Sequence, residues 1–219
     1  MAVEVVRGKD ATIHFDAQKC IHSRHCVLSH PDVFVPNVKG EWIHPDAQPV
    51  AELIRVGQNC PSGAIRVVRN AESDIAGDAL SSDNFPIVNT IRVRENGPLA
   101  IEAELQLKGQ ALTTPRATLC RCGQSNNKPY CDGSHVAAGF IATGEPASAT
   151  FEALATRNGP VNVQPTPNGP LRLVGNLEVV TGTGRTCNKV GETYLCRCGH
   201  SNNKPYCDGS HKAAGFQAD

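Results

Sequence analysis

Three features that would point to particular classes of protein are missing from this sequence. Neither charge is in excess, because 21 Lys and Arg balance 21 Asp and Glu, which argues against a nucleic-acid-binding surface or a polybasic membrane patch. No apolar run approaches the roughly 20 residues that span a bilayer. The opening stretch MAVEVVRGKDATIHFD lacks the apolar core and cleavage site of a secretory signal. We therefore expect a cytoplasmic protein that binds neither nucleic acid nor membranes.

Aromatic residues are also scarce, at 5% of the chain, whereas there are 20 Gly, 15 Pro and 10 Cys. The core must then come mainly from aliphatic side chains, and the composition favours small, turn-rich modules that a metal centre helps to stabilise. A disulfide framework is the alternative use for ten cysteines, but it would need a secreted chain, since the cytosol keeps thiols reduced. We expect the cysteines to bind metal.

The sequence contains an internal duplication. Residues 119–140 read LCRCGQSNNKPYCDGSHVAAGF, and residues 195–216 repeat this text except at Gln124/His200 and Val136/Lys212. An Asn-Gly-Pro-Leu segment precedes each block, at 96–99 and at 168–171. Such a duplication predicts two related structural units in one chain.

The remaining text divides the chain into three parts. Residues 71–84, AESDIAGDALSSDN, lack apolar periodicity and are typical of a linker. Before it, ATIHFD and AIRVV predict two strands, and DAQPVAELIRVGQNC predicts a helix that ends at Cys60. After it, Asn96-Gly97 predicts a hairpin, and each DGSH motif predicts a short helical start. We expect an α+β protein with domains at residues 1–72, 85–146 and 147–219.

Each repeated block has the ligand spacing C-x-C-x8-C-x3-H. The candidate ligands are Cys120, Cys122, Cys131 and His135 in the first copy, and Cys196, Cys198, Cys207 and His211 in the second. Three thiolates and one imidazole can hold a tetrahedral zinc ion or a two-iron cluster. Zinc knuckles usually have two to four residues between cysteines, whereas one intervening residue places two thiolates together on an extended segment. This spacing favours a dinuclear centre in which each ligand pair holds one iron.

The block also resembles the CDGSH (NEET) iron–sulfur proteins, whose signature C-x-C-x2-[ST]-x3-P-x-C-D-G-[STA]-H both copies match throughout. The resemblance implies a [2Fe–2S] cluster in each copy, with His135 and His211 bound through Nδ1 near solvent. Members with one motif form homodimers with an intertwined β-cap. Two motifs in one chain therefore imply an intramolecular pseudo-dimer with a β-rich cap, and hence a monomer.

Three further cysteines, Cys20, Cys26 and Cys60, stand in CIHSRHC and CPSGAI. A Cys-Pro after a helix is the closing ligand of bacterial ferredoxins, but Ser23 replaces the middle cysteine of their first motif. The segment resembles single-cluster ferredoxins, specifically the divergent domain that accompanies CDGSH motifs. Three thiolates favour a [3Fe–4S] cluster. The alternatives are [4Fe–4S] with a fourth ligand from His22, Ser23 or His25, and a zinc site that uses His22 or His25.

Cys187 has no counterpart in the first copy and is interpreted as a spare thiol. No nucleotide-binding or Ser–His–Asp pattern is left to suggest catalysis. We therefore expect an electron carrier rather than an enzyme, with a redox partner protein. The alternatives are a cluster donor or redox sensor, with an apo iron–sulfur acceptor as partner, and a structural metal module.

Overall fold

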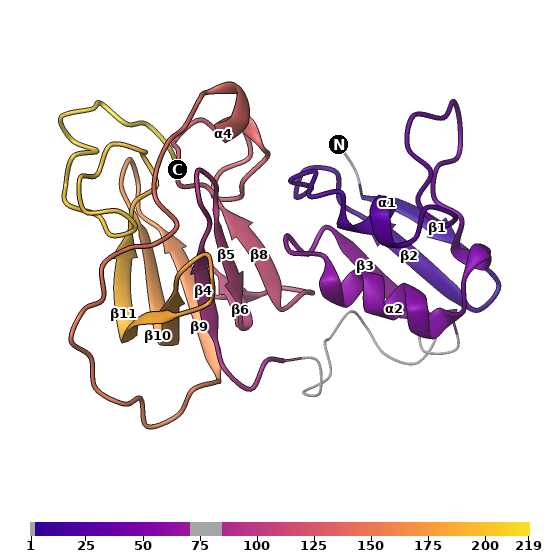
Figure 1. Cartoon of the computed structure of the whole chain (residues 1–219), viewed down its shortest axis with the longest axis horizontal. Helices are drawn as coiled ribbons and strands as arrows, with labels where there is room; N and C mark the ends of the chain where they lie inside the picture. The colour runs from indigo at the N-terminus through magenta and orange to yellow at the C-terminus, as the bar shows by residue number, and fades with distance from the viewer. Residues whose placement is uncertain (1–2, 71–84) are drawn as a thin grey trace. The chain divides into compact units, whose positions relative to one another are not determined.

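The computed structural model describes residues 3–70 and 85–219, and it is rich in sheet with few helices (Figure 1). The described residues form two separate compact units, residues 3–70 and residues 85–219. No helix among the described residues is long and apolar enough to cross a membrane. The segment 71–84, expected to be a linker, lies outside the described residues.

The N-terminal unit is a three-stranded antiparallel sheet in the order β1-β2-β3, covered by short helices. Its elements are β1 (Glu4–Arg7), β2 (Ala11–Phe15), α1 (His25–Ser29), the 3-10 turn η1 (Pro45–Ala47), α2 (Val50–Asn59) and β3 (Ile65–Arg69). The two predicted strands are β2 and β3, which pair in the sheet. The predicted helix is α2, whose buried residues Leu53 and Val56 join the core, and Cys60 is its C-cap.

The C-terminal unit is an eight-stranded sheet with the order β7-β6-β9-β10-β4-β5-β8, to which β11 adds by pairing with β10. The first copy contributes β4 (Thr90–Val93), β5 (Leu99–Glu102), β6 (Glu104–Leu107), β7 (Gln110–Ala111), β8 (Arg116–Leu119) and α4 (Ser134–Ala137). The second contributes β9 (Pro160–Pro165), β10 (Leu171–Val180) and β11 (Thr186–Leu195).

The two copies are interleaved in this sheet. The second half of β10 pairs in parallel with β4 of the first copy, and β6 pairs in parallel with β9 of the second. One apolar core collects buried side chains from both, including Ile91 and Leu99 from the first and Val161 and Leu173 from the second. Because the buried side chains of this core come from both copies, residues 85–146 and 147–219 complete one core together.

The turns follow the sequence signals. Asn96 and Asn168 both have a positive φ, 48° and 52°, and each lies in the turn of an antiparallel hairpin, β4–β5 and β9–β10. The DGSH motif of the first copy begins the helix α4. The equivalent residues of the second copy form turns instead, so the expected second helix is wrong. Such a short segment lies at the limit of what distinguishes a helix from a turn.

Candidate metal centres

The predicted ligands of each repeat lie together in pairs. The Sγ atoms of Cys120 and Cys122 are 3.8 Å apart, and Cys131 Sγ lies 3.4 Å from His135 Nδ1. Sulfur ligands at about 2.3 Å on one tetrahedral ion lie about 3.8 Å apart, and a sulfur and an imidazole nitrogen about 3.5 Å. Each pair therefore has the spacing of two ligands on one metal ion.

The second copy repeats this arrangement. Cys196 Sγ is 3.7 Å from Cys198 Sγ, and Cys207 Sγ is 3.5 Å from His211 Nδ1. Within residues 3–70 and 85–219, however, no three His, Cys, Asp or Glu side chains converge closely enough to hold a single ion. A mononuclear zinc site needs four ligands around one point. Two separate pairs fit a dinuclear centre better.

Backbone hydrogen bonds bring the two halves of each motif together. Cys120 follows β8 directly, and its amide donates to Pro129 O at 2.8 Å, while the Cys131 amide donates to Thr118 O at 2.8 Å. The corresponding bonds of the second copy, from Cys196 and Cys207, measure 2.8 and 2.9 Å. The end of a rigid strand therefore fixes the ligand loop.

Backbone amides also face the ligand sulfurs. The amide of Gln124 donates to Cys122 Sγ and that of Gly133 to Cys131 Sγ, each at 3.4 Å. His200 and Gly209 make the same contacts in the second copy, also at 3.4 Å. Such donors stabilise negative charge on sulfur and raise the reduction potential of a bound cluster.

The first thiol pair shares its protons unequally. The hydrogen bond from Cys122 lowers the pKa of Cys120 to about 6, and the same bond, together with burial, raises the pKa of Cys122. Burial raises the pKa of Cys131 to about 11. These thiols must lose their protons to bind a metal. The positive charge of the metal would then take the place of the proton that Cys120 and Cys122 share.

A buried arginine stands between the first two cysteines of each copy. Arg121 and Arg197 are 1% and 0% exposed. Arg121 donates to the carbonyl oxygens of Arg94, Gly97, Ala142 and Thr143 at 2.5 to 3.2 Å. Arg197 donates to those of Thr166, Gly169, Ala218 and Asp219 at 2.7 to 3.4 Å. Each guanidinium therefore joins a hairpin turn to the segment that follows the ligand histidine.

The sequence interpretation missed these arginines, although their repetition inside both CRC triplets was a signal. Phe140 and Phe216 lie against the two guanidinium groups, with 5.4 Å between the guanidinium carbon and the ring centre in both copies. Burial lowers the pKa of Arg121 to about 10, which still leaves it charged at neutral pH. A buried cation needs nearby negative charge, which Glu95 and, once they are deprotonated as ligands, Cys122 and Cys196 would provide.

The two repeat sites meet through their backbones. Cys122 and Cys198 form an isolated antiparallel bridge. Beside it, Gly123 and Gly199 have φ values of +84° and +85°, and a Cβ on either would lie 2.4 Å from the carbonyl oxygen of the opposite cysteine. Only glycine fits both the backbone conformation and this close approach.

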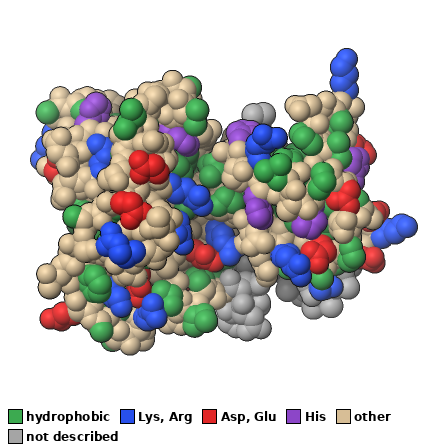
Figure 2. Space-filling model, viewed as in Figure 1, with side chains coloured by type: hydrophobic (Ala, Val, Ile, Leu, Met, Phe, Trp, Pro, Cys, Tyr) green, Lys and Arg blue, Asp and Glu red, His purple; other side chains and the backbone are tan. Residues whose placement is uncertain are grey.

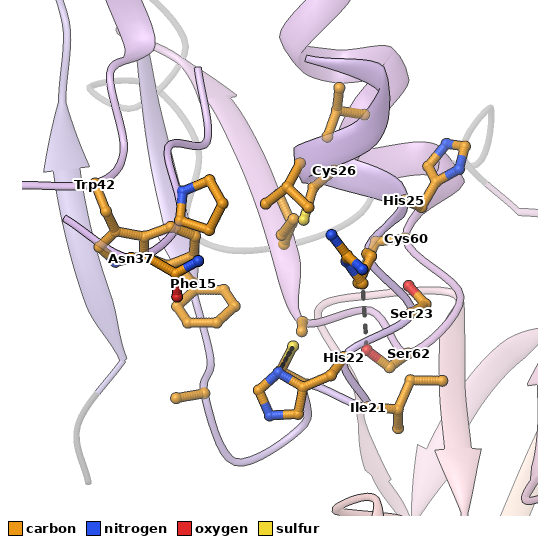
Figure 3. A pocket seen from close by; sticks show the side chains of 18 residues that line it. Phe15, Ile21, His22, Ser23, His25, Cys26, Asn37, Trp42, Cys60 and Ser62 are labelled. Atoms are coloured by element: carbon orange, nitrogen blue, oxygen red, sulfur yellow. Dashed lines mark hydrogen bonds between the residues drawn. The ribbon is translucent and has the colours of Figure 1, made fainter. Parts of the chain in front are cut away.

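The three cysteines of the N-terminal unit line one cavity of about 570 Å³ (Figure 3). Cys26 lies in α1 and Cys60 at the end of α2, whereas Cys20 comes from the loop after β2. Phe15 and Trp42, which contact each other edge to face at 5.0 Å, form part of the wall. Burial raises the pKa of both Cys20 and Cys26.

The other candidate ligands of this unit also line the cavity. His22, Ser23 and His25 line it, as does Ser62, whose Oγ lies 3.7 Å from Cys60 Sγ. No single-ion site of three or more ligands is found among the described side chains, which disfavours the zinc alternative. In a cubane cluster each cysteine binds a different iron, so its thiolates need not converge on one point.

The remaining cysteine lies apart from these sites. Cys187 is fully buried in the core of the C-terminal unit, and its thiol donates to Val179 O at 3.3 Å. All ten cysteines are free, so no disulfide framework is present. The eleven predicted ligands therefore gather at three places, two in the C-terminal unit and one in the N-terminal unit. Figure 2 shows His side chains at the surface of both units.

Comparisons with known proteins agree with this division. The family model described as "Iron-binding zinc finger CDGSH type" matches residues 96–136 and 168–212, and the model "Divergent 4Fe-4S mono-cluster" matches residues 6–70. Two curated relatives, both the "Uncharacterized protein YjdI" from Escherichia coli (strain K12 and O157:H7), are each 37% identical over 60 residues. The alignment covers 27% of this chain and 76% of the relative.

The paired ligands and these matches define an iron–sulfur protein. The chain belongs to the CDGSH iron-binding family through its two repeats, and it carries a divergent 4Fe-4S mono-cluster domain in front of them.

Proposed function

We propose that this chain is a cytoplasmic electron carrier rather than an enzyme, with one [2Fe–2S] cluster in each CDGSH copy and one [4Fe–4S] cluster in the N-terminal unit. The observation that carries the proposal is the arrangement of each repeat's ligands as two separate pairs with the spacing of two ligands on one ion. The family description of the N-terminal unit favours [4Fe–4S] over the [3Fe–4S] cluster that its three cysteines suggest.

The interleaved sheet supports an intramolecular pseudo-dimer, and hence a monomer. The pairing of β4 with β10 has its counterpart in the pairing of β9 with β6, and the contacts of Gly123 and Gly199 are reciprocal. Two equivalent halves that exchange strands within one chain leave little need for a second chain.

When bound, such clusters supply one-electron redox chemistry. The protein's own groups would hold them and tune their charge. Cys120, Cys122 and Cys131 would hold the first, with His135 at its outer edge, because the thiols are buried whereas the imidazole is partly exposed. The amides at the sulfurs and the buried Arg121 would stabilise the negative charge that reduction adds.

The partly exposed histidines also support the second candidate function, a cluster donor or redox sensor. An imidazole that bulk water reaches can be protonated and released from a metal. Burial lowers the pKa of His135, so the free imidazole is neutral and able to bind a metal at pH 7. This favours a carrier at neutral pH and a donor in acid.

Anaerobic redox cycling distinguishes the two functions. The purified protein is reduced and reoxidised repeatedly at pH 7 while visible absorbance, iron and sulfide are measured, and an apo iron–sulfur acceptor is then added. A carrier returns to its starting spectrum with its iron retained and loses nothing to the acceptor. Transfer of cluster to the acceptor at pH 7 would instead support the donor function, and a colourless protein with bound zinc would overturn both.

A further inference from the structure

The N-terminal unit has three cysteine ligands, one fewer than the four ligands that the proposed [4Fe–4S] cluster needs. A [4Fe–4S] cluster presents four irons, and each takes a ligand from outside the cluster. Only Cys20, Cys26 and Cys60 line the cavity as thiols. Ser23, at the place of the middle ferredoxin cysteine, has a short side chain that would have to lose its hydroxyl proton to bind iron as an anion.

Among the described residues of this unit, two polar side chains other than cysteines lie within hydrogen-bonding distance of a ligand thiol. His22 Nδ1 lies 4.0 Å from Cys20 Sγ, and Ser62 Oγ lies 3.7 Å from Cys60 Sγ. The contact shows that the His22 ring reaches the thiols. Because each ligand of a cubane binds a different iron, the ring would have to turn away from Cys20 to bind an iron of its own. Ser62 is a buried neutral hydroxyl, 2% exposed, with the same limitation as Ser23. A neutral imidazole, by contrast, is the commonest metal ligand among protein side chains and binds without losing a proton.

The backbone holds His22 in an unusual conformation. His22 has φ of 53° and Arg24 has φ of 61°, in the left-handed region that residues with a Cβ seldom occupy, at a cost of order 1 kcal/mol each. Figure 3 shows the result: the His22 ring lies at the cavity beside a sulfur, joined to it by a dashed line, whereas the His25 ring lies out beside the helix. The loop thus turns the His22 imidazole toward the thiols, whereas the His25 imidazole belongs to the first residue of α1.

We propose that His22 is the fourth protein ligand of the N-terminal centre and binds iron through Nδ1, giving three cysteines and one histidine. The inference rests on the [4Fe–4S] cluster of the proposed function. The neutral ring donates the Nδ1 lone pair to iron and keeps its proton on Nε2, which the exposed position of the residue leaves to solvent. All three centres of the chain would then carry one imidazole each.

The test compares His22→Ala with two controls at neighbouring residues that also line the cavity, Ser23→Ala and His25→Ala, in the full chain. Wild type and both controls should bind about eight irons, from two two-iron clusters and one four-iron cluster. His22→Ala should lose one iron and gain the EPR signal of an oxidised [3Fe–4S] centre. His22→Cys covers the case in which the alanine variant fails to fold: it should keep all the irons, and its N-terminal cluster should have a lower potential, because thiolate replaces a neutral ligand.

A direct measurement uses 15N-labelled histidine and pulsed EPR of the reduced N-terminal cluster. It is made with His135 and His211 replaced by Cys, so that the CDGSH copies contribute no imidazole coupling. We expect a nitrogen coupling that His22→Ala removes and His25→Ala keeps. Eight irons in wild type and in His22→Ala, with no nitrogen coupling, would overturn the role of His22 alone. Seven irons in wild type would overturn the [4Fe–4S] assignment itself, and the inference with it.

Discussion

Alanine at position 123 would place a methyl group where the two copies of the repeat come closest. Gly123 has φ of +84°, and its Cβ would lie 2.4 Å from the carbonyl oxygen of Cys198 and 2.9 Å from the carbonyl carbon. The conformation alone costs a residue with a Cβ about 1 kcal/mol. The contact adds more, because both atoms belong to the backbone and the bridge must open to relieve it; overpacking of this kind costs about 1–3 kcal/mol. We expect a total loss of about 2–4 kcal/mol of stability.

Gly109 provides the matched control. It has the same φ of +84°, between β6 and β7, but nothing lies within 4 Å of the position that a Cβ would take. Gly109→Ala should therefore cost only the conformational part, about 1 kcal/mol. The variants are compared by urea unfolding of the C-terminal unit, followed by the visible absorbance of its clusters. At a slope of about 2 kcal/mol per M, the further cost of about 1–3 kcal/mol should lower the midpoint of Gly123→Ala by about 0.5–1.5 M relative to Gly109→Ala.

Equal midpoints for the two variants would refute the close approach of Cys122 and Cys198. Gly199→Ala supplies a second check, since its Cβ would meet Cys122 O at the same 2.4 Å. It should match Gly123→Ala and not Gly109→Ala.

The remaining predictions concern the charges and ligands of the repeats. Arg121→Met should destabilise the holoprotein by about 3–5 kcal/mol, since it leaves four carbonyl oxygens without their donor. Arg121→Lys keeps the charge but loses the planar set of guanidinium donors, so its unfolding midpoint should lie between those of the wild type and Arg121→Met. Iron and sulfide analysis of anaerobic protein should find about eight irons per chain, and four would leave only the CDGSH clusters. Replacing His135 and His211 by Cys should lower the potentials of both CDGSH clusters and slow their bleaching in acid. The reason is that a proton taken up by the iron-bound nitrogen removes the imidazole as a ligand; unchanged bleaching rates in acid would show that these histidines are not ligands.

The sequence alone predicted the local parts of this structure well. Alternation around Asn96-Gly97 predicted the β4–β5 hairpin, and apolar spacing predicted a helix that ends at Cys60. These features depend on neighbouring residues, whose preferences act within a turn or two. The same is true of the ligand pairs, because one or three intervening residues restrict how far two side chains can separate.

Features that join distant segments were not predictable in the same way. An identical repeat pattern is compatible with two separate lobes or with one interleaved sheet, and only the burial of one common core decides between them. The burial of Arg121 and Arg197 was missed because arginine is almost always exposed. Nothing local to a CRC triplet indicates that hairpin carbonyls from more than twenty residues away will surround the guanidinium.

The placement of both repeats in one chain has a consequence for how the two centres can differ. In a pair of identical chains, every substitution beside one cluster appears beside the other. Here Val136, 76% exposed, follows the ligand His135, whereas an exposed lysine, Lys212, follows His211. One centre thus has an apolar neighbour at its surface and the other a cation. In the proposed electron carrier, the surface and the reduction potential of each centre can therefore evolve separately.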